Sequence, residues 1–199
     1  APSLQAAGVR EALTLEGGVR RVRADYTSTD RFLANGDDSG EVRFARTVPV
    51  LGARMQVAPR LQAFASAGQG LETPTLNEAA YRSGGATGLN TDLNAARSTS
   101  AEIGLRGRHA IGWWNATLFD IRTRDEIVVE SSGGGRTVFT NAGRTERSGL
   151  ELSGEVALGD WTLATAYTHL RARYAASADA RFPAGNALPD PWGGAAQAP

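Results

Sequence analysis

The sequence predicts an all-β protein, an antiparallel meander of about seven long strands. Three observations support this. Apolar and polar residues alternate strictly through residues 150–158 (LELSGEVAL), which gives a strand with one apolar and one polar face. Glycine, at 24 of 199 residues, favours turns. No apolar run approaches the roughly 18 residues of a membrane-spanning helix. Such strands occur in a soluble sandwich or in a membrane barrel.

The composition excludes several classes of function. The 21 basic and 21 acidic residues balance, so no net field attracts nucleic acid. The absence of cysteine removes disulfides, thiolate nucleophiles and cysteine-held metal sites. His109 and His169 have no Ser or Asp arrangement of diagnostic spacing, and GGG at 133–135 is not a phosphate loop. We therefore expect no catalytic residue, no metal site and no cofactor.

The first part of the chain predicts three strands. Residues 1–9 carry little signal. Alternating patterns follow, separated by a polar loop at 28–40 and a tight turn at Pro59, and they predict strands at about 11–27, 41–57 and 60–70.

Two places in these strands predict irregular pairing. Gly17 and Gly18 are expected to mark a bulge or bend. The apolar phase changes after Pro49, from Val48 to Leu51. We therefore expect Pro49, with Gly52, to mark a bulge that re-registers the strand.

The second part of the chain predicts four more strands after a long break. Residues 71–97 lose the alternation, and so irregular a segment usually serves function or flexibility. SSGGG at 131–135 is expected to be a loop, and the tail from Ala175 to be irregular. Strands are predicted at about 98–108, 113–130, 136–158 and 161–174.

The lengths of the connections favour a membrane barrel. Short turns at 58–60, 109–112 and 159–160 alternate with longer connections at 28–40 and 71–97. Outer-membrane barrels sort short turns to one rim and long loops to the other, whereas a sandwich has no reason to do so.

The polar face and the tryptophans fit the same setting. In a wide barrel, the polar face would line a wet lumen with Glu102, Arg106, Arg108, Glu151 and Glu155. In a sandwich these residues would cover the outside. Three tryptophans follow short turns, where an aromatic girdle at one membrane interface would lie: Trp113, Trp114 and Trp161.

Four segments resemble the β-barrel of TonB-dependent outer-membrane receptors. They are LQAFASAGQGLETPTLNEAAY, GLNTDLNAARSTSAEIGLRG, WWNATLFDIRTRDEIV and FTNAGRTERSGLELSGEV, in the family's order and spacing. The second segment departs from the pattern. It has Thr91 and Ala95 where prolines are common, and Ala96 where glutamate is usual.

The resemblance implies a partial, open segment of a transmembrane barrel of about 22 strands, spanning residues 1–199 without a plug domain. It implies the outer membrane of a Gram-negative bacterium. Its partners would be lipid, the remaining strands and plug, TonB, and a scarce ligand such as a ferric siderophore. Tyr81 and Arg82, in the loop at 71–97, are the best candidates to touch an anionic, aromatic ligand.

Two further expectations remain open at this stage. A soluble β-sandwich binding or adhesion module is the alternative function. The chain by itself is expected not to carry out transport, because open strand edges in lipid leave backbone groups unsatisfied.

Overall fold

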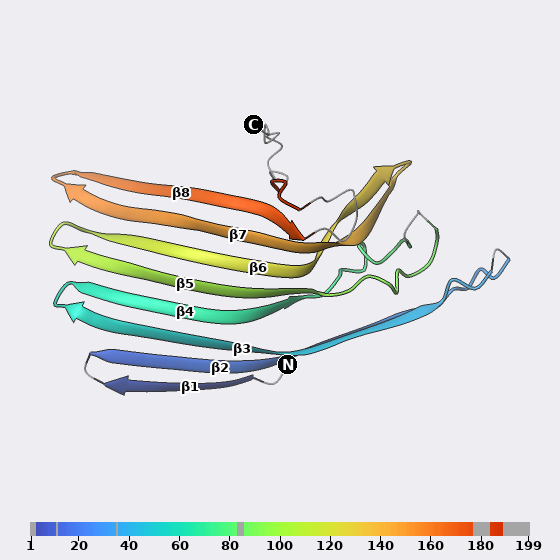
Figure 1. Ribbon diagram of the computed structural model, residues 1–199, viewed down its shortest axis with the longest axis horizontal. Coiled ribbons are helices and arrows are strands. Elements are labelled where there is room, and N and C mark those ends of the chain that lie inside the picture. The colour runs from blue at the N-terminus through green and yellow to red at the C-terminus, as the bar shows by residue number, and fades with distance from the viewer. Residues whose placement is uncertain (1–2, 11, 35, 83–85, 177–183, 189–199) are drawn as a thin grey trace.

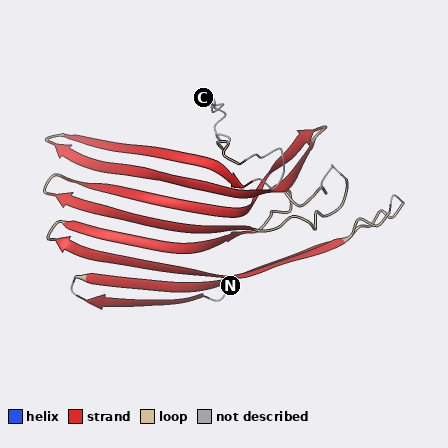
Figure 2. Ribbon diagram, in the orientation of Figure 1, coloured by secondary structure: helices blue, strands red, loops and turns tan. Residues whose placement is uncertain are grey.

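The computed structural model describes residues 3–10, 12–34, 36–82, 86–176 and 184–188 (Figure 1). These residues form one antiparallel sheet of eight strands in sequence order. No second sheet faces it within the described ranges, so the sandwich is not favoured, and the predicted all-β meander is confirmed (Figure 2). The strands are β1 Ser3–Arg10, β2 Leu13–Ser28, β3 Gly40–Ala58, β4 Leu61–Glu72, β5 Ala96–His109, β6 Gly112–Gly133, β7 Arg136–Leu158 and β8 Trp161–Ala176.

The first strand is one more than the sequence predicts. β1 pairs with β2 from Ser3 opposite Arg20 to Arg10 opposite Leu13. Residues 1–9 carry little side-chain pattern, and backbone pairing with β2 forms this strand instead. The predicted irregular tail lies largely outside the described residues, except that Ala175 and Ala176 still belong to β8.

The two long connections lie at one end of the sheet and four of the short turns at the other, while the two-residue turn between β6 and β7 lies at the end with the long connections (Figure 1). One end has turns of two residues between β1 and β2, β3 and β4, β5 and β6, and β7 and β8. At the other end, residues 29–39 and 73–95 connect β2 to β3 and β4 to β5. In the described part of the chain, no helix is long and apolar enough to cross a membrane.

The loop predicted at 131–135 is shorter than expected. β6 extends to Gly133 and β7 begins at Arg136, so only Gly134 and Gly135 form the turn of this long hairpin. Both glycines have positive φ, 57° and 77°. A tight hairpin turn of this type needs positive φ at both central residues, and glycine adopts it without strain.

The bulge predicted at Pro49 and Gly52 is wrong, and Gly17 and Gly18 do not form a bulge either, while a bend at these two glycines stays a prediction. β2 and β3 pair without interruption from Leu13 opposite Met55 to Ser28 opposite Gly40. The apolar residues therefore change faces while the strand keeps its register. A shift in register occurs elsewhere, between β3 and β4 near Gln56.

Near the short turns, one face of the sheet carries mainly apolar side chains and the other carries polar and charged ones. Paired residues share a face, and the face that carries Leu150 and Leu152 is here called the outer face. Its apolar side chains are unusually exposed, for example 66% for Leu51, 61% for Ile103 and 58% for Leu163. This outer apolar band comprises Leu13, Leu15, Val19, Leu51, Ala53, Met55, Ala63, Ala65, Ala67, Ala101, Ile103, Leu105, Trp114, Ala116, Leu118, Leu150, Leu152, Val156, Leu158, Trp161, Leu163 and Tyr167.

Buried residues gather instead at the end with the long connections. Ala79, Leu89, Leu93 and Ala95 of the 73–95 connection are at most 6% exposed, and Ala142 of β7 is fully buried. The long break in the pattern is therefore a packed segment, and it is shorter than predicted because residues 71–72 belong to β4 and residues 96–97 to β5.

Candidate functional site

The candidate site is the face opposite the outer apolar band, here called the inner face. The pairing register places the five predicted polar residues on this face. Arg106 is opposite Asn115, which is opposite Ser153, and Arg108 is opposite Trp113, which is opposite Glu155. Glu102 and Glu151 fall on the same face, opposite Phe119 and Thr117 respectively. All five predicted residues are exposed to solvent.

Aromatic and polar contacts order the middle of the inner face. The Ser66 hydroxyl donates to Glu102 at 2.9 Å. The Arg106 guanidinium lies over the Phe64 ring, 5.6 Å from its centroid. Gly104 leaves room for this ring, because a Cβ there would come within 2.3 Å of Phe64 Cζ. The inner face therefore presents a cation over an aromatic ring and, separately, a carboxylate bound by a hydroxyl group.

The three predicted girdle tryptophans do not share a face. Trp161 is opposite Leu158 and Trp114 is opposite Gly154, so both belong to the outer apolar band. Trp113 is opposite Glu155 and lies on the inner face. The girdle prediction is therefore wrong for Trp113, because adjacent residues of a strand point to opposite faces.

Tyr81 and Arg82 do not combine into one contact, because the Arg82 guanidinium does not lie over the Tyr81 ring. The guanidinium over the Tyr81 ring belongs to Arg136, at the start of β7, 5.2 Å from the ring centroid. Arg82 stays within its own loop, where its Nε donates to the Leu89 carbonyl at 3.4 Å. The sequence could not indicate Arg136, because 55 positions separate it from Tyr81.

One asparagine of β7 holds the end of the 73–95 connection. The Asn141 amide nitrogen donates to the carbonyls of Asn94, at 2.9 Å, and of Asp125, at 2.7 Å. Its amide oxygen accepts from the Asn94 N–H at 2.7 Å. Asn90 adds a bond from its side chain to the Phe139 carbonyl at 3.3 Å. We call Asn141 and its three backbone partners the asparagine clamp.

The clamp coincides with a local reversal in β6. Asp125 has a left-handed φ of 57°, and its carbonyl is held by Asn141. Pairing resumes at Glu126, opposite Ala142. The Glu126 side chain then contacts Arg147 and Thr145, two inner-face residues of β7. The unusual backbone at Asp125 thus turns Glu126 onto the inner face.

Glu126 forms a half-buried ion pair beyond the apolar band. It accepts bonds from Arg147, one of them at 3.0 Å, and from the fully buried Thr145 hydroxyl. Burial alone would raise the pKa of Glu126. The bonds from Arg147 and Thr145 outweigh burial, so the pKa lies below its ordinary value.

The sequence pattern does not reveal the residues that fix this end of the site. Asn141, Glu126 and Arg147 lie in segments used for the family resemblance, but their partners are 16 to 47 positions away. The only local signal is that the alternation breaks at Asp125. In the described residues, no group of three or more His, Cys, Asp or Glu side chains is placed to hold a metal ion.

Comparison with known proteins supports the fold and its setting. The family model described as "TonB dependent receptor-like, beta-barrel" matches residues 7–194. The copper transporter OprC is similar in structure, with a TM-score of 0.69 and 18% identity over 84% of this chain and 27% of that one. The FrpB iron transporter from Neisseria meningitidis has a TM-score of 0.65 and 20% identity, over 86% of this chain and 25% of that one.

A third similar structure is the siderophore receptor PirA from Pseudomonas aeruginosa. Its TM-score is 0.60 and its identity 19%, over 88% of this chain and 36% of that one. At such identities the likeness to the three structures shows the fold alone. The chain spans between 25% and 36% of their lengths.

Proposed function

Because the chain belongs to the TonB-dependent receptor β-barrel family of the Gram-negative outer membrane, we propose that it contributes wall and ligand-contact surface to a receptor for TonB-dependent uptake of a ferric siderophore. The family consists of transport receptors and not of enzymes. The transported ligand, TonB and a plug domain are partners of the whole receptor, and they enter here as parts of the proposal.

One observation carries the proposal: near the short turns the chain separates an apolar outer face from an inner face that carries charged residues. The outer face exposes Leu51 and Ile103, as lipid contact requires. The inner face exposes Glu102 and Arg106 to what would be a hydrated lumen. The 73–95 connection is pinned over the loop end by Asn141. A ligand arriving from outside would meet this packed segment first.

The chemistry of that segment suits an anionic, aromatic chelate. Tyr81 and Arg136 present a ring with a stacked cation, and Arg82 is a further exposed arginine of the same connection. Aromatic rings and guanidinium groups are the usual partners of planar, negatively charged ligands. Two proteins of similar structure, described as "siderophore receptor PirA" and "Ferric-Catecholate import receptor Fiu", take ligands of this class by their descriptions.

A bare copper ion fits the chain less well, although OprC is described as a copper transporter. Copper sites use thiolate, thioether or imidazole ligands. The chain has no cysteine, one methionine and two histidines. Its methionine, Met55, lies in the outer apolar band and not on the inner face. A chelated metal bound through its organic ligand avoids this difficulty.

Uptake of radiolabelled iron tests the proposal. The protein carrying this chain at full length is expressed in a Gram-negative strain that lacks its own siderophore receptors, with and without TonB. Uptake of a ferric catecholate that requires both the protein and TonB is expected. Uptake of copper salts in place of any ferric siderophore would contradict the proposed ligand class.

Variants then test the ligand-contact residues. Arg136→Gln is expected to raise the half-saturating ligand concentration about fivefold, since a cation on a ring is worth about 1 kcal/mol. Arg82→Gln is expected to act in the same direction. Arg31→Gln is the matched control, because Arg31 is an exposed arginine of the neighbouring 29–39 connection. Equal effects from Arg31 and Arg136 would remove Arg136 from the site.

A further inference from the structure

The outer face carries an excess of positive charge just beyond the apolar band. On the side of the long connections, the outer face of the described strands has nine arginines and four carboxylates, although the whole chain has a formal net charge of +0. We call these residues the outer charged belt. They are Arg21, Arg23, Asp25, Glu41, Arg43, Arg97, Asp120, Arg122, Arg124, Arg144, Glu146, Arg171 and Arg173.

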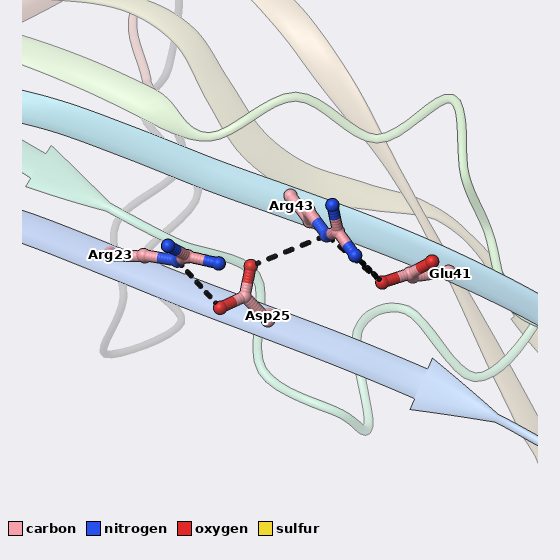
Figure 3. Close-up of polar contacts among 4 residues, drawn as sticks. All are labelled: Arg23, Asp25, Glu41 and Arg43. Atoms are coloured by element: carbon pink, nitrogen blue, oxygen red, sulfur yellow. Dashed lines mark hydrogen bonds and ion pairs between the residues drawn. The ribbon is translucent and has the colours of Figure 1, made fainter.

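On β2 and β3 the belt largely neutralises itself. Arg23 is paired with Asp25 at 2.8 Å, and Arg43 with Glu41 at 2.6 Å (Figure 3). Asp25 also lies 3.7 Å from Arg43, so the four residues form one chain of alternating charge across the two strands. This part of the belt needs no outside anion.

The belt on β5 to β7 is different. Arg97 is directly opposite Arg124, and Arg124 is directly opposite Arg144, so three arginines stand side by side across three strands. Side chains in such positions lie about 5 Å apart at Cβ, and like charges there are destabilising. All three are exposed.

Nearby carboxylates do not balance this row. Glu146 lies 3.7 Å from Arg144, but it is held more closely by Arg173, at 2.9 Å. Asp120 is taken by Arg122, also at 2.9 Å. Among the described residues, neither Arg97 nor Arg124 has a carboxylate within ion-pair distance. The row therefore has the geometry of an anion site whose counter-charge comes from outside the chain.

The position of this arginine row relative to the outer apolar band indicates which anion would reach it. Ala101 ends the apolar band on β5, and Arg97 lies four residues farther along the strand, about 13 Å along a strand that tilts in a barrel. The polar headgroup layer is about 5–7 Å thick on each side of a bilayer, and a long arginine side chain can reach back toward it. Long connections of such barrels face outward from the cell.

We propose that Arg97, Arg124 and Arg144 bind phosphate groups of an outer-leaflet lipid. Arginine suits this role because its charge is permanent and its planar fork matches phosphate oxygens. Lipid phosphate relieves the repulsion within the row and holds the β5 to β7 wall at a fixed height in the membrane. This inference concerns the outer face and is independent of the transported ligand.

Native mass spectrometry tests the site on the full-length protein in mild detergent. The probe is bisphosphorylated lipid A, compared with phosphatidylcholine and with inorganic phosphate. The test variant is Arg97→Gln/Arg124→Gln/Arg144→Gln. Each basic residue near an anionic lipid surface contributes about 1 kcal/mol, or about fivefold. The variant is therefore expected to bind lipid A about 100-fold more weakly.

The control removes the same charge from the inner face, through Arg54→Gln/Arg106→Gln/Arg108→Gln. It is expected to keep lipid A binding, and both variants are checked for folded barrel by their heat-dependent mobility on gels. Three results would overturn the proposal: unchanged binding in a folded test variant, equal loss in the control, or displacement of lipid A by an equal concentration of inorganic phosphate.

Discussion

The asparagine clamp makes a specific prediction about the 73–95 connection. Asn141→Ala removes three hydrogen bonds, of 2.7, 2.7 and 2.9 Å, that join β7 to Asn94 and Asp125. Only the two bonds to Asn94 hold the connection, and each is worth about 1 kcal/mol net, so the free energy of local opening of this segment should fall by about 2 kcal/mol. That corresponds to an equilibrium constant for opening that is about 30-fold larger. The strands within the apolar band should be unaffected, because none of these bonds reaches them.

Amide hydrogen exchange measures this effect residue by residue. The N–H of Asn94 should lose its protection in Asn141→Ala, together with the neighbouring amides of residues 86–93. The exchange rate in Asn141→Asp should lie between those of the parent and of Asn141→Ala. This variant keeps the acceptor for the Asn94 N–H, but it places a carboxylate next to two carbonyl oxygens. Asn77→Ala is the matched control in the same connection, since its side chain makes no hydrogen bond to any residue that the structure describes.

Either of two results would show that the asparagine clamp does not hold the connection. If Asn141→Ala leaves exchange in residues 86–95 unchanged while the barrel stays folded, packing of Leu89 and Leu93 alone holds the segment. If Asn77→Ala gives the same acceleration, the effect is a general property of the connection and not of the clamp.

Four further predictions follow from other parts of the structure. The pKa of the Glu126 carboxylate is lowered in the fold, so this group stabilises the fold above its unfolded pKa of about 4.3, and the stabilisation is lost as the pH falls through the folded pKa. In Glu126→Gln, the free energy of unfolding measured by urea titration should therefore decrease less as the pH is lowered. A variant whose free energy of unfolding decreases as steeply as that of the parent would contradict this prediction. Leu152→Lys, in the outer apolar band, should cost about 2–4 kcal/mol in the membrane, while Glu151→Lys on the inner face should assemble normally, as judged by the folded fraction in outer-membrane extracts. Gly104→Ala should destabilise the barrel by about 1–3 kcal/mol, because a Cβ there meets Phe64 and a backbone carbonyl, whereas Gly52→Ala has open space and should be neutral in the same melting assay. Cells that express residues 1–199 alone should take up no ferric siderophore, and uptake by such cells would show that this sheet transports without further strands.

Strand positions were predictable from sequence wherever apolar and polar residues alternate along the strand. The ends of seven strands agree with the structure to within three residues, as at β7, where Arg136 and Leu158 match. β1 was missed because backbone pairing and not side-chain pattern defines it. The assignment of polar residues to one face likewise needed only the period of two.

The remaining features depend on contacts between distant residues. At Pro49 the sequence shows a change of apolar phase but not its cause, and a bulge and a change of surroundings give the same pattern. For Trp113, proximity to a short turn suggested lipid, while the face is set by pairing with Glu155. The asparagine clamp joins residues 47 positions apart, and no local pattern announces such a partner.

The uninterrupted pairing of β2 and β3 has a consequence for how deep the barrel sits. On the outer face, Val19 belongs to the apolar band and Arg21 to the outer charged belt, while Val22 and Phe44 lie on the inner face. If the hairpin sank by one repeat of two residues, its alternation would survive but Arg21 would enter hydrocarbon. If it rose by the same step, apolar surface would be left in water. The change of face therefore fixes the position of the sheet along the membrane normal to within one repeat of two residues.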